Sequence, residues 1–225
     1  MTASNLQTVD LDKTFKVGGH DVKAVQKANL EGKSGELIAI MGPSGSGKTT
    51  LLSLVGCLDK PSGGKVIIDG VDVTDIRESS LYRIRRGKIG FIFQTFNLIE
   101  SLNAVENVEL PMENTIKSRV ERKEKALKLL ALVGLKDRGQ HRPTQLSAGE
   151  QQRVAIARAL ANDPAIILAD EPTGSLDSET GLNIVKMLRR LSSDKKCLVL
   201  MVTHDNLMAS LASRTISMRD GKLAS

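Results

Sequence analysis

The chain has no long hydrophobic run and very few cysteines. Its longest uninterrupted apolar stretch is Cys197–Val202, far short of the roughly 20 residues that cross a bilayer. No apolar segment typical of a signal peptide follows the first residues. The two cysteines, Cys57 and Cys197, lie in apolar runs and not in a metal-binding spacing, which predicts reduced core thiols. We therefore expect a soluble, cytoplasmic protein that reaches a membrane only through a partner.

A long basic block is also missing, and aromatic residues are scarce. The 32 Lys and Arg against 26 Asp and Glu give a net charge of +6, a balance that suits nucleic acid, an acidic membrane surface or nucleotide phosphates. Aromatic residues make up 2% of the chain, yet three of the four phenylalanines lie within Phe91–Phe96. The length predicts one domain with subdomains over residues 1–225.

Glycine and serine are concentrated in residues 42–50, directly after the apolar run Leu37–Met41. This segment fits the pattern G-x-x-x-x-G-K-[ST], with a strand-like run before it and a helix-like run after it. Glycines let backbone N–H groups wrap a triphosphate, and a helix start directs further N–H groups toward it. Lys48 adds a cation, and Thr49 a hydroxyl for Mg²⁺. The alternative is a Gly/Ser-rich turn without a ligand. We expect a nucleotide site formed by Gly42, Pro43, Ser44, Gly45, Ser46, Gly47, Lys48, Thr49 and Thr50.

A second apolar run, Ala165–Ala169, leads into two adjacent carboxylates. Such a run is typical of a parallel strand that is covered on both faces, and ligands bind at the carboxyl ends of such strands. Asp170 is suited to hold Mg²⁺, and Glu171 to act as general base for a water that attacks the γ-phosphate. The alternative is a pair of surface acids. The last buried strand ends just before His204, which predicts an imidazole at the same edge.

The segments that precede these runs predict an antiparallel β-rich part. Residues 6–16 alternate apolar and polar, Gly18-Gly19 separates them from residues 22–30, and a third strand covers 65–68. Phe15 either stacks on a nucleotide base or closes the core of this small sheet. Gln94 follows the predicted strand 89–93, where its amide oxygen can ligate Mg²⁺ or orient a water; the alternative is an ordinary surface residue.

Residues 98–162 show a helical pattern, in which Leu127, Leu130 and Ala131 are predicted to form the buried face of 120–133. Ser147-Ala148-Gly149-Glu150 has the spacing of a capping box, and therefore of a helix start. This start is either purely structural or an anion site for a γ-phosphate. We favour the anion site because polar residues follow it and the strand that ends in Asp170 comes next.

In this order, the motifs resemble the nucleotide-binding subunit of an ATP-binding cassette (ABC) transporter, over essentially the whole chain. Residues 42–52, 56–64, 89–99, 106–112, 145–160 and 168–177 resemble the branch that contains lipoprotein-releasing and macrolide-export ATPases. The resemblance implies an α/β fold: a P-loop NTPase core with a mainly parallel sheet, an antiparallel β subdomain and an inserted α-helical subdomain at about 98–162.

The same resemblance implies that ATP and Mg²⁺ are bound, and it implies a role for each site residue. Phe15 stacks on the base. Ser147, Ala148, Gly149 and Glu150 act on the nucleotide of a second subunit, and Asp177, grouped with them as part of the nucleotide site, makes a contact across the dimer. The implied catalytic residues are Lys48, Gln94, Glu171 and His204, and the implied metal ligands are Thr49, Gln94 and Asp170. Two positions depart from the usual pattern: Ala148, commonly Gly, and Phe15, commonly Tyr.

The function implied is that of an ATPase subunit that dimerises around two Mg-ATP and drives a transmembrane permease carried on another chain. Export or lipoprotein release is the favoured direction, with Phe91–Ile99 as the docking surface and a location at the inner face of the membrane. One alternative is the ATPase of an importer. Another is a soluble cassette protein that acts on ribosomes or DNA, but such proteins usually carry two cassettes or a long coiled coil, so no nucleic acid is expected.

Overall fold

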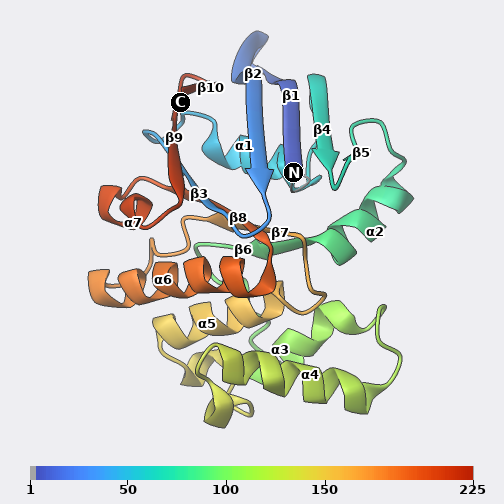
Figure 1. Ribbon diagram of the computed structural model, residues 1–225, viewed down its shortest axis with the longest axis vertical. Helices are drawn as coiled ribbons and strands as arrows, with labels where there is room; N and C mark the ends of the chain where they lie inside the picture. Colours follow the sequence, from blue (N-terminus) through green and yellow to red (C-terminus); the bar gives the residue numbers. More distant parts are fainter. Residues whose placement is uncertain (1–3, 225) are drawn as a thin grey trace.

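A six-stranded, mostly parallel sheet forms the centre of the computed structural model, which describes residues 4–224 (Figure 1). Its order is β10-β9-β3-β8-β7-β6, and every neighbouring pair is parallel except β9 and β10. The strands are β3 (Leu37–Met41), β6 (Ile89–Ile92), β7 (Ile166–Asp170), β8 (Leu198–Thr203), β9 (Arg214–Arg219) and β10 (Lys222–Ala224). The parallel strands bring several carboxyl ends to one edge of the sheet.

Both faces of the central strands β3, β7 and β8 are buried, which explains their continuous apolar runs. In β3, Leu37 and Ala39 belong to one hydrophobic core, whereas Ile38 and Ile40 belong to the other. Consecutive side chains of a strand point to opposite faces, so each central strand contributes to both cores.

A separate antiparallel sheet covers one side of the molecule, in the order β2-β1-β4-β5 (Figure 1). Its strands are β1 (Ser4–Val17), β2 (His20–Lys33), β4 (Gly63–Ile68) and β5 (Val71–Asp72). Gly18 and Gly19 form the β1–β2 turn with φ of 56° and 83°, as the sequence predicts. Helix α1 (Lys48–Val55) packs between the two sheets and buries Leu51 and Leu54.

Helices cover the other face of the central sheet, with α5 and α6 next to it and α3 and α4 outside them (Figure 1). They are α3 (Ala104–Glu109), α4 (Arg119–Leu132), α5 (Ala148–Ala159) and α6 (Ser178–Lys195). Shorter or peripheral helices are α2 (Glu78–Lys88), α7 (Asn206–Ser210), η1 (Leu110–Met112), η2 (Lys136–Arg138) and η3 (Pro143–Gln145). The helices α3, α4 and α5 all lie between β6 and β7 in the chain.

The predicted buried face of α4 is wrong for two of its three residues. Leu127 is 38% exposed and Ala131 is also exposed, and only Leu130 lies in the core. The residues that do pack inward are Ala126, Leu129, Leu130 and Val133. They follow the same helical spacing shifted by one position, and packing against the neighbouring helices selects this phase.

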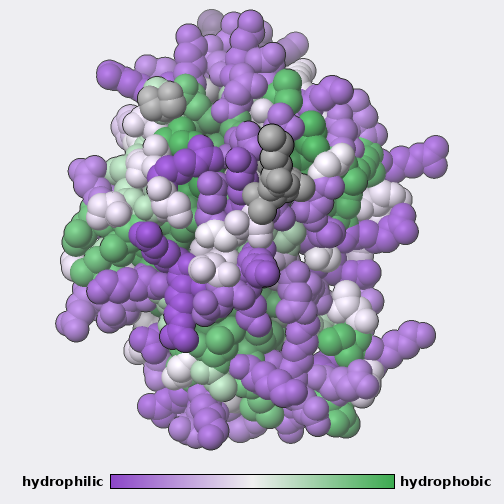
Figure 2. Space-filling model, in the orientation of Figure 1, coloured by the Kyte–Doolittle hydropathy of each residue, from purple (hydrophilic) through white to green (hydrophobic). Residues whose placement is uncertain are grey.

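Both cysteines are buried and free, as predicted, and burial raises the pKa of each thiol to about 11. Among the helices within residues 4–224, none has both the length and the apolar composition needed to cross a bilayer. On the face shown in Figure 2, hydrophilic residues prevail and the hydrophobic ones form separate patches.

Candidate active site

The loop between β3 and α1 packs so closely against neighbouring strands that two of its glycines have no room for a side chain. A Cβ at Gly42 would lie 2.0 Å from the carbonyl oxygen of Met218, and one at Gly47, whose φ is 102°, would lie 2.1 Å from that of Ala24. Gly45, with φ 77°, faces open space. Gly42 and Gly47 are therefore required for the loop to pack against its neighbours, in addition to any role in admitting a ligand.

Lys48 is the first residue of α1 and is only 6% exposed. Its ammonium group donates hydrogen bonds of 2.8 Å to the carbonyl oxygens of Gly42 and Pro43. The hydroxyl of Ser46 is buried in the same loop and has no hydrogen-bond partner. A buried cation and an unpaired hydroxyl beside a helix start are the groups that a phosphate would satisfy.

A cavity of about 610 Å³ opens beside this loop, within the size range of small-molecule and cofactor sites. The loop residues that line it are Ser44, Gly45, Gly47, Lys48, Thr49 and Thr50, and Glu171 joins them. The sequence did not identify the other lining residues, Asp21, Val22, Lys23, Ala24, Gln26, Asp220 and Gly221. In the sequence, the pair Asp220-Gly221 indicates only a turn. The turn reaches the cavity because β9 pairs with β3, which places the Gly221 N–H 3.0 Å from the Ser46 carbonyl oxygen.

Phe15 lies on the hairpin that borders the cavity. It pairs across the strands with Val22, which lines the cavity, and directly opposed residues of an antiparallel pair share a face. The ring is 38% exposed, with the ammonium nitrogen of Lys13 4.9 Å from its centroid. The alternative that Phe15 closes the core of the small sheet is therefore wrong.

Asp170 ends β7 beside the loop. The Thr49 hydroxyl lies 3.3 Å from Asp170 Oδ1 and donates a hydrogen bond to it. Burial raises the pKa of the Asp170 carboxyl, and the Thr49 hydrogen bond opposes that shift in part. This hydrogen bond thus links the end of β7 to the start of α1.

Glu171 and His204 follow neighbouring strands and meet at the same edge. Glu171 Oε1 lies 3.2 Å from His204 Nδ1, and the Glu171 N–H donates to the Val202 carbonyl oxygen at 3.0 Å. Glu171 has a φ of 44°, a left-handed conformation that costs about 1–3 kcal/mol for a residue other than glycine and that persists only where the surroundings fix it. The predicted placement of an imidazole beside these acids is seen.

Gln94 is exposed and lies in the loop after β6, outside the lining of the 610 Å³ cavity. The Ser175 hydroxyl donates to the Gln94 carbonyl oxygen at 3.2 Å, and a Cβ on Gly174 would lie 2.8 Å from Gln94 Nε2. Gln94 therefore packs against the turn that follows Glu171.

A second cavity, of about 650 Å³, contains the α5 start. It is lined by Ser147, Ala148, Gly149, Glu150, Arg153, Ser175, Leu176, Asp177 and Thr180. None of these residues lines the 610 Å³ cavity. One chain thus carries two separate candidate phosphate sites.

The capping box at the α5 start is present as predicted. Ser147 Oγ accepts from the Glu150 N–H at 3.2 Å, and Glu150 Oε2 accepts from the Ser147 N–H at 2.9 Å. Arg138 Nε donates to the other oxygen, Oε1, at 3.0 Å, and these bonds lower the pKa of Glu150. Asp177 caps α6 by accepting from the Thr180 N–H at 2.9 Å. Glu150 and Asp177 thus each stabilise the start of a helix that borders the 650 Å³ cavity.

Comparison with known proteins places these motifs in a family. Residues 25–174 match the ABC transporter family. The chain is 49% identical, over 95% of its length and 93% of the relative's, to the uncharacterized ABC transporter ATP-binding protein MJ0796 of Methanocaldococcus jannaschii. It is 45% identical to the macrolide export ATP-binding/permease protein MacB of Burkholderia pseudomallei, over 99% of this chain but 34% of MacB. A dimeric MJ0796 structure in a post-hydrolysis state with ADP and Pi superposes with a TM-score of 0.89, at 47% identity over 98% of this chain and 97% of that one.

Proposed function

The chain belongs to the ABC transporter family as its ATP-binding and ATP-hydrolysing component, and from this premise we propose that two copies enclose two ATP molecules to drive a separate membrane protein. The observation that carries the proposal is the pair of separate cavities, one containing Lys48 and the other Ser147. Two chains related by a twofold axis can pair each loop with the other chain's helix start. The relative MJ0796 forms a dimer with ADP and Pi.

In this assembly, the residues around the loop hold and activate the phosphates. Lys48 exchanges its two carbonyl partners for phosphate oxygens, and the α1 start contributes N–H groups. Glu171 accepts the proton of the attacking water. His204, 3.2 Å from Glu171, orients this carboxylate and faces the γ-phosphate. The partner's α5 start supplies N–H groups to the same phosphate, while Glu150 fixes that start.

Mg²⁺ fits the donor set at the edge of the sheet. The Thr49 hydroxyl and the Asp170 carboxylate, 3.3 Å apart, would supply oxygen atoms, and we propose the Gln94 amide as a further ligand, since Mg²⁺ prefers a few such ligands together with substrate phosphates. Burial raises the pKa of Asp170, and a bound cation would favour the charged carboxylate. When bound by these residues, Mg²⁺ would neutralise charge that develops on the phosphates.

We expect ATP hydrolysis to require Mg²⁺ and to fall about 100-fold or more in Asp170→Asn, the order of loss for a charge that acts on the transition state. Phosphate release with and without chelator measures both effects. Asp163→Asn, at a surface residue paired with Lys125, is the matched control and should keep activity. Turnover in excess chelator would contradict the proposed metal site.

Phe15→Ala should weaken ATP binding by about 1–3 kcal/mol if its ring stacks on the base, whereas Phe15→Tyr should be nearly neutral. Titration calorimetry with ATP measures the difference. Val17→Ala, on the same strand and 60% exposed, controls for changes in the hairpin. Normal ATP affinity in Phe15→Ala would rule out stacking.

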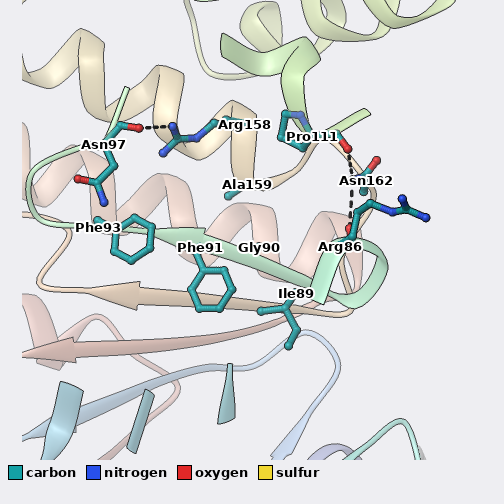
Figure 3. Close-up of a pocket in the computed structure, with 10 residues that line it drawn as sticks. All are labelled: Arg86, Ile89, Gly90, Phe91, Phe93, Asn97, Pro111, Arg158, Ala159 and Asn162. Atoms are coloured by element: carbon teal, nitrogen blue, oxygen red, sulfur yellow. Dashed lines mark hydrogen bonds between the residues drawn. The ribbon is translucent and has the colours of Figure 1, made fainter. Parts of the chain in front are cut away.

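The membrane partner is proposed to dock on the Phe91–Ile99 region, of which Phe91, Phe93 and Asn97 help to line a groove of about 290 Å³ beside β6 (Figure 3). Phe91 and Phe93 are half-buried there, with parallel rings whose centroids lie 5.8 Å apart, and Arg86 lies at the rim. The similarity to MacB favours an export-like partner, and docking places the chain at the inner face of the membrane. The alternative to an export-like partner is the membrane protein of an importer.

Phe93→Ser should release the membrane protein that co-purifies with the chain, and undiminished retention would argue against this surface.

A further inference from the structure

Helix α2 and the residue before it carry most of the net positive charge of the chain. The segment Arg77–Lys88 has five basic residues and one carboxylate, that of Glu78, and hence a net charge of +4. The whole chain has a net charge of +6, so all other residues together contribute only +2. Because the charge is concentrated on one short helix, α2 is the element that attracts an anionic partner most strongly.

Two of these five cations hold α2 on the body of the protein. Arg85 pairs with Glu78, and its other terminal nitrogen donates to the Cys57 carbonyl oxygen at 2.8 Å. Lys88 pairs with Asp69 at 2.8 Å. These contacts compensate the charges of Arg85 and Lys88, which leaves three arginines for other partners.

Arg77, Arg83 and Arg86 have no carboxylate partner within the part of the chain that the structure describes. Arg83 donates to the Ser80 hydroxyl at 3.2 Å, and the guanidinium carbon of Arg86 lies 5.3 Å from the centroid of the Tyr82 ring. Tyr82, the one tyrosine of the chain, is 47% exposed. Unpaired cations around an exposed tyrosine are typical of a protein surface that lies against a membrane, since arginine attracts anionic lipids and tyrosine is enriched at headgroup level.

The end of α2 adjoins the groove beside β6 at which the membrane partner is proposed to dock. Arg86 lines that groove, and Asn162 Nδ2 fixes the helix end by donating to the Arg86 carbonyl oxygen at 3.0 Å and to that of Pro111 at 2.9 Å (Figure 3). The helix itself lies at the edge of the molecule (Figure 1). A protein segment that enters the groove therefore leaves the outer side of α2 uncovered.

On the basis of the membrane docking proposed above, we propose that Arg77, Tyr82, Arg83 and Arg86 form a lipid-contacting surface that binds the anionic headgroups beside the docked membrane protein. The guanidinium groups can each donate two parallel hydrogen bonds to a lipid phosphate. The Tyr82 ring packs among the headgroups while its hydroxyl stays hydrated. The chain is then held at the membrane by a protein contact and a lipid contact together, and two linked contacts retain it more firmly than either alone.

The test uses the purified chain at low ionic strength with millimolar lipid, in vesicles of equal parts phosphatidylglycerol and phosphatidylcholine. Arg77→Gln/Arg83→Gln should bind these vesicles about 25-fold more weakly than the parent, since each arginine near an anionic surface contributes a factor of about five. The parent should not bind vesicles of phosphatidylcholine alone, and added salt should release it. ATP hydrolysis by the variant should match the parent, because neither arginine lines the 610 Å³ or the 650 Å³ cavity. Cosedimentation and phosphate release measure the two properties.

Lys128→Gln/Lys186→Gln is the matched control. It removes the same charge from exposed lysines of α4 and α6, neither of which has an ion pair within residues 4–224, and it should bind the vesicles as the parent does. Equal loss in this control, or a parent that ignores phosphatidylglycerol, would overturn the inference. Tighter retention on duplex DNA than on the vesicles would overturn it too, by assigning the surface to nucleic acid. The vesicles hold no membrane protein, so the result is independent of the docking groove, which Phe93→Ser tests separately.

Discussion

Lys48→Ala is expected to reduce ATP hydrolysis by about 100- to 1,000-fold, the loss typical of removing one preorganised charge from a transition state. The ammonium of Lys48 is nearly buried, and within residues 4–224 its hydrogen bonds go to two loop carbonyls. It can therefore turn to a phosphate without breaking an ion pair. ATP binding should weaken as well, because the same charge contacts the ground-state phosphates. Phosphate release and ATP titration measure the two losses separately.

Two comparisons make this result specific to the site. Lys65→Ala removes a lysine that is exposed and paired with Asp72, and should leave hydrolysis unchanged. Thermal unfolding of Lys48→Ala shows whether the loop, having lost two hydrogen bonds, remains folded. Unchanged turnover in a folded Lys48→Ala protein would refute the assignment of the loop to ATP.

Glu171→Gln should convert an ATP-dependent encounter into a stable dimer. The amide cannot accept a proton from the attacking water, so the two chains close around ATP and do not reopen. In the proposed assembly ATP forms part of the interface, so dimerisation should be linked to ATP by mass action. We expect mainly monomer without nucleotide or with ADP, and dimer with ATP. Light scattering at several ATP concentrations distinguishes these states.

Ser147→Arg should prevent that dimer in the Glu171→Gln background, because a long side chain would fill the place of the partner's phosphate. ATP binding to the monomer should persist, since Ser147 does not line the 610 Å³ cavity. Ser118→Arg is a close control: Ser118 caps α4 by accepting from the Glu121 N–H at 3.3 Å, as Ser147 caps α5. A dimer indifferent to Ser147→Arg, or lost equally in Ser118→Arg, would defeat the two-chain mechanism.

Local patterns predicted those parts of the site in which neighbours along the chain act together. The loop at residues 42–50 lies between a strand and the start of a helix, and the capping box Ser147–Glu150 lies at the start of its own helix. The spacing of residues alone therefore identifies the loop and the capping box. The Asp170-Glu171 pair follows the apolar run of β7 for the same reason. The roles of these residues stay predictions until the variants are measured.

The sequence by itself determined the strands β3, β6, β7 and β8, the phosphate loop, the acids at a strand end and the start of α5, because each shows as a local pattern; it did not predict the last two strands of the sheet, β9 and β10. Only the tertiary structure decided which distant segments complete the site. Strand order brings Gly221 to Ser46, and helix packing selects Leu129 over Leu127 for the core. The contact of Arg158 with the Gln94 loop joins residues that are 61 and 62 positions apart. Such pairs leave no periodic trace in a sequence, since their closeness arises from how whole elements pack.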